Sequence, residues 1–279
     1  MARTKVSLDG RTAYISGAAS GIGRALAQIL SARGCPLAIV DQDEAGLEHT
    51  AQSLPGPVLA HRLDVRDARA QAEFAAEVAR WAPTPLGLVG NIAGVTTAQT
   101  VAGSVIADDD WVLDINFHGM VHGVRAFLPI LLEQDSGVIV NMSSAYGLVG
   151  WPQHSAYCAS KFAVRGFTDA LRQELRDSGV HAVTVVCGGV KSNIARNARY
   201  HAEALGPGVT PTQAAEQFEA IARTTPERAA EIILHGVIAG RSRVLVGPDA
   251  YLFDAVSRLM PVRYFDFFAG LGRLYSRRG

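Results

Sequence analysis

The fold of this chain is decided by residues 11–32, which read RTAYISGAASGIGRALAQILSA. Residues 11–16 predict a short strand, and the apolar residues that follow Gly23 recur at helical spacing, so we expect a helix over 21–33. Three glycines, at positions 17, 21 and 23, lie between the two elements. A strand, a glycine turn and a helix in this order form the first half of a dinucleotide-binding unit.

The glycine turn predicts a phosphate-binding site. Glycine lets the backbone turn sharply and approach a pyrophosphate closely. The new helix adds unpaired N–H groups and the positive end of its dipole. A flexible loop is the alternative, but the position between strand and helix favours phosphate binding. The expected contacts are Gly17, Ser20, Gly21, Ile22 and Gly23.

The end of the second predicted strand, at Asp41, predicts the choice of cofactor. Asp41 follows Gly23 by 18 residues, close to the ~20 expected of the acid that binds the adenosine ribose. Its carboxylate repels a 2′-phosphate, and neither Gln42 nor Ser20 is a basic residue that would attract one. The sequence therefore predicts NAD over NADP. Alternatively, or in addition, Asp41 caps the helix that begins near Glu44.

Length and composition predict one cytoplasmic α/β domain. The 279 residues are 48% hydrophobic and 19% charged, enough for a single large core, and the formal net charge of zero does not suggest a nucleic-acid partner. Three widely spaced cysteines fit a reducing cytosol better than a disulfide framework. The start lacks an apolar signal core, and no run of ~18 apolar residues predicts a membrane span.

Strands and helices alternate along the whole chain. Continuous apolar runs such as residues 138–140 are typical of buried parallel strands, and the helices between them imply right-handed crossovers. We therefore predict a single-domain Rossmann fold with a doubly wound parallel sheet of about seven strands and helices on both faces. The expected strands are 11–16, 36–41, 57–62, 86–91, 136–142, 181–187 and 242–246, and the expected helices are 21–33, 43–53, 67–81, 108–133, 154–178 and 226–239.

Polar and glycine-rich segments follow four of the predicted strands. Ligands of such sheets bind beyond the carboxyl ends of the strands, so these segments are expected to lie around one site. The Asp64 carboxylate is a candidate contact for the adenine amino group. The segments are Asp64-Val65, Asn91-Ile92-Ala93-Gly94, Ser143-Ser144 and Cys187-Gly188-Gly189-Val190-Lys191-Ser192.

The pair Tyr157 and Lys161 lies within the predicted helix 154–178. A spacing of four places the two side chains on one helix face, one turn apart. A fixed ammonium stabilises a neighbouring phenolate, so we expect Lys161 to lower the pKa of Tyr157. Alone, the pair would be an ordinary solvated helix face.

In combination, these motifs resemble those of the short-chain dehydrogenase/reductase family, of its classical subgroup, over roughly residues 8–250. The resemblance implies four catalytic residues, Asn116, Ser144, Tyr157 and Lys161. Ser144 is assigned by its 13-residue separation from Tyr157, and Ser143 is expected to face away. The motifs are Gly17-x-x-x-Gly21-x-Gly23, Asn91-x-Ala93-Gly94, Asn116, Ser144 and Tyr157-x-x-x-Lys161.

The resemblance implies NAD(H)-dependent interconversion of a secondary alcohol and a ketone, with Tyr157 as general acid and base. Lys161 would bond the nicotinamide ribose, Ser192 would contact the carboxamide, and Ser144 would hold the substrate oxygen. Asn116 would hold a water that links Lys161 to solvent; alternatively, it is a helix-kink residue that bonds the local backbone. The implied cofactor contacts also include Asp64, Val65, Asn91, Ala93, Gly94, Tyr157, Gly188 and Val190.

Two positions depart from the family pattern. Ile92 replaces the usual second Asn, and Cys187 replaces the usual Pro before Gly188. Proline fixes φ and removes an N–H, so Cys187 is expected to alter the loop beside the nicotinamide. We expect Cys187 to serve in packing, because a reactive thiolate needs a positive neighbour; Lys191, near in sequence, leaves a reactive role as the alternative.

The segments outside these motifs predict a substrate pocket and its cover. Residues 190–224 lack a strand pattern and are expected to form a substrate lid. Apolar residues between Ser144 and Tyr157 suggest a moderately large apolar substrate, although they could equally be core. The expected lining is Tyr146, Leu148, Val149, Trp151 and His154.

Three further features of the sequence bear on metal binding, on oligomerisation and on membrane contact. His118 and His122 are one helical turn apart, but no metal site is expected, since the Glu of the zinc-protease motif is missing. The resemblance suggests a homodimer or homotetramer built on helices 108–133 and 154–178. Residues 1–250 are expected to form the catalytic domain and residues 251–279 an apolar, basic arm over the pocket or a neighbouring subunit. Peripheral membrane contact by the arm is the alternative.

Two other functions use the same fold. A redox sensor or scaffold could bind NAD without turnover, but it has no need of Ser144, Tyr157 and Lys161. An epimerase or dehydratase usually carries a larger C-terminal substrate domain, for which this chain has no room.

Overall fold

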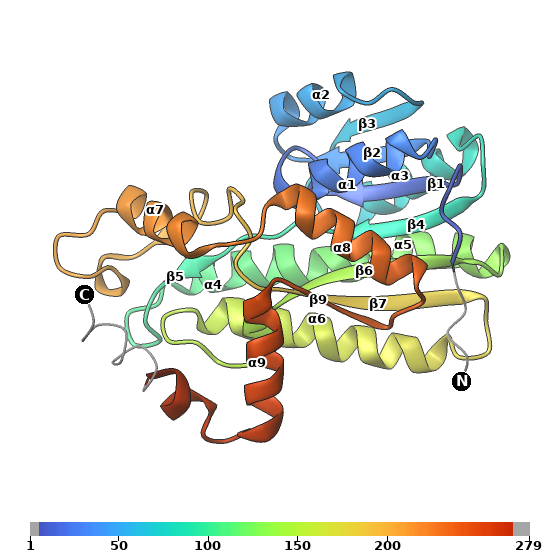
Figure 1. Cartoon of the computed structure of the whole chain (residues 1–279). Helices are drawn as coiled ribbons and strands as arrows, with labels where there is room; N and C mark the ends of the chain where they lie inside the picture. The colour runs from blue at the N-terminus through green and yellow to red at the C-terminus, as the bar shows by residue number, and fades with distance from the viewer. Residues whose placement is uncertain (1–5, 270–279) are drawn as a thin grey trace.

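A seven-stranded parallel sheet forms the centre of the computed structural model, which describes residues 6–269. The strand order is β3-β2-β1-β4-β6-β7-β9, so the chain first winds outward from β1 in one direction and then in the other (Figure 1). This is the predicted doubly wound Rossmann arrangement in a single domain. The strands are β1 (Thr12–Ser16), β2 (Leu37–Asp41), β3 (Val58–Arg62), β4 (Leu86–Asn91), β6 (Gly137–Ser144), β7 (Val180–Cys187) and β9 (Arg243–Val246).

Two apolar layers hold helices on both faces of the sheet. On one face, Leu26, Leu30 and Ile233 pack from the helices against the buried side chains of β1 and β7. On the other face, Phe74 and Phe127 fill the equivalent layer. The first face is covered by α1 (Gly21–Ala32), α2 (Glu44–Gln52) and α8 (Pro226–Ile238), and the second by α3 (Ala68–Trp81), α5 (Gly119–Glu133) and α6 (Ser155–Glu174).

The expected helix over 108–133 is not a uniform α-helix. It consists of α4 (Ile106–Leu113), a π-helical turn (Asp114–His118) and α5. The π turn contains Asn116, whose amide bonds the backbone of Val95 on the neighbouring loop instead of its own helix. A π turn is a local widening that apolar periodicity does not reveal, and such turns are frequent at functional sites.

Two short strands and two α-helices of residues 6–269 were absent from the sequence prediction. Residues 190–224 contain a short strand, β8 (Arg199–Tyr200), which pairs with β5 (Thr97–Ala98), and a helix, α7 (Pro211–Ile221). Two-residue strands are too short to produce a readable pattern. The C-terminal arm begins with α9 (Pro248–Leu259), which lies beside the carboxyl ends of β7 and β9.

The C-terminal arm packs against a third, small apolar cluster. Phe268 and Val256 of the arm are buried with Val149 and Val186, and the Tyr264 hydroxyl accepts a hydrogen bond from the N–H of Gly150. The described part of the arm therefore packs against the region between Ser144 and Tyr157. Residues 270–279, with the last basic residues of the expected arm, lie outside the described part. Within residues 6–269 no helix has the length and apolarity needed to cross a membrane.

Candidate active site

A cavity of about 760 Å³ opens at the carboxyl edge of the sheet. It is lined by side chains and backbone atoms from six strand ends, from the residue 190–224 segment and from α9. Nearly all sequence-predicted site residues meet there, although they are spread over 176 positions of the chain from 17 to 192. They are Gly17, Ser20, Gly21, Ile22, Gly23, Asp41, Asp64, Val65, Ala93, Gly94, Ser144, Tyr146, Trp151, His154, Tyr157, Lys161, Gly188, Val190 and Ser192.

The glycine turn is packed so tightly that side chains would not fit. Gly17 has φ +71°, and a Cβ there would lie 2.8 Å from the Cα of Ala93. A Cβ on Gly23 would collide with the carbonyl of Gly17. Ser20 is the N-cap of α1, but its side chain makes no capping bond. The first N–H groups of α1 are therefore available to a ligand at this end of the cavity.

Asp41 holds the glycine turn and does not cap α2. Its carboxylate accepts hydrogen bonds from the N–H of Ala19 at 3.0 Å and of Asp43 at 3.1 Å. The cap of α2 is Asp43, which accepts from the N–H of Gly46 at 3.1 Å. The prediction that Asp41 caps α2 is therefore wrong. An N-cap at residue 41 requires a helix that begins at residue 42, whereas α2 begins at Glu44.

A basic residue that is distant from Asp41 in the sequence lies near it in space. Arg62 ends β3 directly beside Asp41 in the parallel register, and its Nε donates to the carbonyl of Gln42 at 3.3 Å. The only available signal was the pairing of the second and third predicted strands.

Two other predicted contacts are occupied by the protein itself. The Asp64 carboxylate binds the Arg66 guanidinium through both oxygens, at 2.6 to 3.0 Å, and this pairing lowers the pKa of Asp64. Asn91 lies outside the cavity lining, since its side chain is buried and donates to Asn141 of β6 at 2.8 Å. The Asn91 side chain therefore joins two strands.

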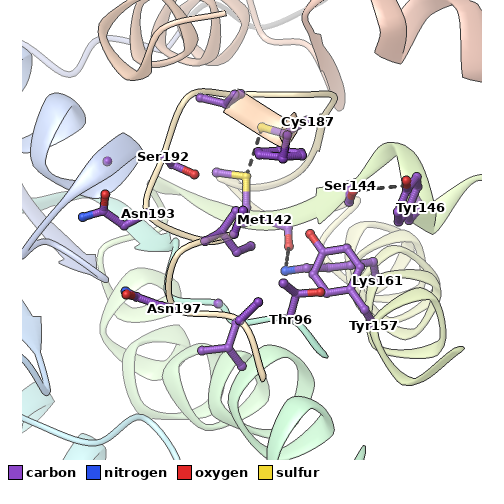
Figure 2. A pocket seen from close by; sticks show the side chains of 18 of the residues that line it. Thr96, Met142, Ser144, Tyr146, Tyr157, Lys161, Cys187, Ser192, Asn193 and Asn197 are labelled. Carbon is purple, nitrogen blue, oxygen red and sulfur yellow. Dashed lines mark hydrogen bonds between the residues drawn. The ribbon is translucent and has the colours of Figure 1, made fainter. Parts of the chain in front are cut away.

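Ser144, Tyr157 and Lys161 lie close together in the wall of the cavity (Figure 2). Ser144 ends β6, while the other two residues project from the first turns of α6. Lys161 is 2% exposed, and its Nζ donates to the carbonyl of Met142 at 3.0 Å and lies 5.5 Å from the centre of the Tyr157 ring. The helix spacing thus places both side chains on the face that meets the strand end.

The expected lowering of the Tyr157 pKa by Lys161 is not what the structure shows. Burial raises the pKa of the Tyr157 phenol to about 12, and a hydrogen bond with Ser144 offsets this only in part. Burial also lowers the pKa of Lys161 to about 8. Desolvation dominates because both groups lie in the protein interior, where it penalises each charged form.

The neighbours of these three residues fix their backbone. Ser143, as expected, points away from Tyr157: its hydroxyl donates to the carbonyl of Lys161 at 2.8 Å. Asn116 lies behind Lys161 and donates to the Ser160 hydroxyl at 3.0 Å. A Cβ on Gly94 would lie 3.2 Å from the Asn116 amide oxygen and 3.3 Å from the Lys161 Nζ, so these residues are packed together.

An aromatic wall borders the other side of Tyr157. Tyr146 stacks on Trp151, with ring centres 5.5 Å apart, and meets Tyr157 edge-on at 6.2 Å. Phe253 of α9 completes the wall at 5.8 Å from Trp151; the sequence suggested an arm over the pocket but did not single out this residue. The expectation that Leu148 and Val149 line the pocket is wrong, since both are buried in the third apolar cluster.

Residues 187–190 form the remaining wall, and a second missed residue holds them. Asp249, at the start of α9, accepts a hydrogen bond from the N–H of Gly189. The N–H of Gly188 donates to Val246 at 2.9 Å, so backbone and carboxylate together fix the turn in which Cys187 replaces proline. Asp249 follows the seventh predicted strand, and this position is the signal that could have found it.

Cys187 has the surroundings of a packing residue. Its thiol lies 3.4 Å from the Met142 sulfur, and burial raises the pKa of the thiol to about 12 although Lys161 opposes this shift. Cys35 and Cys158 are also buried free thiols.

The two histidines of the π turn and α5 have separate partners. His118 pairs with Asp114 at 3.0 Å, and His122 lies 3.4 Å from the Val65 carbonyl. Within residues 6–269 no group of three or more His, Cys, Asp or Glu side chains has the arrangement of a metal site.

Comparison with known proteins gives a consistent family. The model for short chain dehydrogenases matches residues 11–203. The chain is 42% identical to the putative oxidoreductase SadH of Mycobacterium tuberculosis over 265 residues, which cover 92% of this chain and 94% of the relative.

Solved structures of the same kind superpose on this one. A short-chain dehydrogenase/reductase from Burkholderia phymatum in complex with NAD has a TM-score of 0.80 at 28% identity, over 90% of this chain and 94% of the other. Levodione reductase has a TM-score of 0.76 at 26% identity, over 88% and 98%. The glycine turn, the Tyr157 and Lys161 pair beside Ser144, and these matches show that the chain belongs to the short-chain dehydrogenase/reductase family of oxidoreductases.

Proposed function

We propose that this protein interconverts a secondary alcohol and a ketone with NAD(H), using Tyr157 as general acid and base. The observation that carries the proposal is the meeting of Ser144, Tyr157 and Lys161 in the same cavity as the glycine turn. A proton donor, a hydrogen-bond partner for the substrate oxygen and a buried cation thus lie within reach of one bound molecule.

The cavity residues fit a dinucleotide. The glycine turn leaves room where Cβ atoms would collide, and α1 presents N–H groups that no side chain caps. We assign Gly17 to Gly23 to the pyrophosphate, Asp41 to the adenosine ribose, and Val190 and Ser192 to the nicotinamide end. When bound, the nicotinamide accepts or donates the hydride, and the protein supplies orientation and proton control.

Each residue beside Tyr157 has a separate role in the proton transfer. A phenol with a pKa of about 12 is protonated at neutral pH and can donate to a forming alkoxide during ketone reduction. The Ser144 hydroxyl hydrogen-bonds the substrate oxygen and steadies it. Lys161, which keeps most of its charge below a pKa of about 8, lies 5.5 Å from the Tyr157 ring, and its charge opposes without outweighing the cost that burial imposes on the phenolate. Asn116 supports Lys161 from behind.

The preference for NAD rests on the carboxylate of Asp41. It lies at the end of the cavity that the glycine turn borders, where a 2′-phosphate would bring further negative charge. The structural neighbour from Burkholderia phymatum binds NAD, which agrees with this proposal. Arg62 provides the opposite charge only one strand away.

The aromatic wall supports a moderately large apolar substrate. Tyr146, Trp151 and Phe253 face the cavity, and Phe218 and Ile221 of α7 border it from the opposite segment. Residues 190–224 are proposed to act as a lid over this region. The neighbour called levodione reductase carries the name of a carbonyl substrate, in line with the proposed chemistry.

The assembly and compartment proposals extend the same function. Homodimers or homotetramers would use α5 and α6, where Leu132 and Phe162 are 44% and 42% exposed. A cytoplasmic location accords with three unpaired cysteines. Membrane contact by the arm is the weaker alternative, because Phe253, Tyr264 and Phe268 are turned toward the protein.

Other functions on this fold have less support. A sensor without turnover gives no reason for burying Lys161 beside Tyr157 at the cost of its desolvation. Within the described residues, the segment after β9 is a short arm and not the larger substrate domain usual in epimerases and dehydratases.

We expect Tyr157→Phe to lower turnover of secondary alcohols by about 10²–10⁴-fold, the usual contribution of a general acid or base. Cofactor affinity, measured by fluorescence titration, should stay unchanged, because the ring is retained. Tyr14→Phe is the matched control, since Tyr14 is buried away from the cavity. Full activity of Tyr157→Phe would rule out the assignment.

The rate of alcohol oxidation should rise with pH between 6 and 8 at saturating cofactor. Oxidation needs the Tyr157 phenolate, whose fraction grows by up to about tenfold per unit below the pKa. Ketone reduction uses the phenol, which predominates throughout, and should change little. An oxidation profile that is flat over this range would contradict the role of Tyr157 as base.

We expect Asp41→Ala to shift the ratio of NAD to NADP affinity by about tenfold or more toward NADP, a change of ~1.4 kcal/mol. The substitution removes the repelling carboxylate and leaves Arg62 nearby. Asp43→Ala, which removes the α2 cap, should lower stability without altering the ratio. A ratio that does not change would mean that Asp41 only holds the turn.

Asp249→Ala should weaken the binding of NAD about tenfold, because a lost hydrogen bond to a charged group costs ~1.5–3 kcal/mol and here releases the residue 187–190 turn. Asp249→Asn keeps an acceptor for Gly189 and should bind nearly as wild type. The control is Asp254→Ala on the same helix, whose carboxylate pairs with Arg243 and Arg258 instead. Calorimetric titration of NAD into all three variants measures the effect. Wild-type affinity in Asp249→Ala would show that the residue 187–190 turn keeps its conformation without Asp249.

A further inference from the structure

His154 occupies a fixed position one helical turn before Tyr157. It is the N-cap residue of α6, and its carbonyl accepts from the N–H of Cys158 at 2.8 Å. Its Nδ1 lies 2.8 Å from the carbonyl oxygen of Thr97. A carbonyl oxygen can only accept, so Nδ1 carries the proton and donates. This bond fixes both the ring orientation and the tautomer.

The other ring nitrogen, Nε2, is left as a hydrogen-bond acceptor. Burial lowers the pKa of His154 below its ordinary value, so the ring is neutral at neutral pH. Among residues 6–269 no group bonds to Nε2, yet the atom is not sealed in the interior, and the residue lines the cavity. The lone pair of Nε2 is therefore free for a ligand that enters beside Tyr157.

The surroundings of His154 make this acceptor selective. The Tyr146 ring lies 5.5 Å from the His154 ring and 6.2 Å from that of Tyr157, so both residues border the same aromatic side chain. Trp151 and Phe253 extend the apolar surface beyond it. The Tyr146 hydroxyl can donate or accept and so does not select, whereas Nε2 of neutral His154 can only accept.

We propose that His154 makes the site selective for substrates with a second hydroxyl group close to the reacting carbon: diols in oxidation and hydroxyketones in reduction. The hydroxyl on the reacting carbon meets Tyr157 and Ser144. The second hydroxyl donates to Nε2 of His154, and the apolar substituent packs against Tyr146 and Trp151. This inference rests on the proposed alcohol oxidation and adds the class of alcohol.

Three related alcohols test the inference: 1-phenyl-1,2-ethanediol, 1-phenylethanol and 2-methoxy-1-phenylethanol. The first can donate a second hydrogen bond, the second has no second oxygen, and the third has an oxygen that can only accept. We expect kcat/KM of the wild type for the diol to exceed both others by about tenfold, since an unmade bond leaves Nε2 desolvated and unpaired.

Substitution of His154 should remove this preference selectively. In His154→Phe, the ratio of kcat/KM for the diol to kcat/KM for 1-phenylethanol should fall from about tenfold to about one, because neither the bond to Nε2 nor the penalty of leaving Nε2 unpaired exists in this variant. His154→Gln keeps an acceptor and should restore part of the preference. His235→Phe, on the exposed side of α8, is the matched control and should behave as wild type.

The outcomes separate the inference from the function on which it rests. Equal kcat/KM for all three alcohols in the wild type, or an equal fall for all three in His154→Phe, would overturn the inference and leave alcohol oxidation standing. A diol and methyl ether that are used equally well would also overturn it, because the second oxygen would then be an acceptor. Absence of Tyr157-dependent oxidation of any alcohol would instead contradict the proposed function.

Discussion

Two reciprocal hydrogen bonds between β6 and α6 are the contact on which the candidate site depends. The Ser143 hydroxyl donates to the carbonyl of Lys161, and the Lys161 ammonium donates to the carbonyl of Met142. Gly147 allows this approach, since a Cβ there would collide with the Ser143 hydroxyl and lie 2.7 Å from the Lys161 carbonyl. Strand and helix are thereby fixed at a spacing that puts Ser144 and Tyr157 side by side. A buried cation among backbone carbonyls is the structural cost of that arrangement.

The same edge of the sheet is completed from the far end of the chain. Asp249 binds the turn at Gly189, and Phe253 joins the aromatic wall that begins at Tyr146. Loops at a sheet edge have few partners within the sheet itself, so elements that return from later in the chain hold them in place. The arm is therefore part of the cavity and links the turn at Gly189 to the aromatic wall at Trp151.

Local patterns predicted the regular elements well and the side-chain partners poorly. The sequence pattern is clear for the run from Val138 to Val140 and for the glycines at 17, 21 and 23. These residue types are needed for a local reason: burial in a strand, or space for the backbone in a turn. The Asp64 carboxylate, for which the sequence suggested an adenine contact, pairs with Arg66 only two residues away, and the sequence did not reveal this pairing. The Asn91 side chain was assigned to the cofactor but joins β4 to β6. A polar side chain has several chemically equal partners, and only the tertiary structure chooses among them.

The sequence by itself determined the seven strands of the main sheet, the glycine turn, and the placement of Tyr157 and Lys161 on one helix face, because all three follow from backbone geometry over a few residues. Only the tertiary structure decided that burial raises the Tyr157 pKa, that Asp41 binds the glycine turn at Ala19, and that His154 presents a lone acceptor. Desolvation and hydrogen-bond pairing are set by atoms that are distant in the chain. No local pattern can specify them.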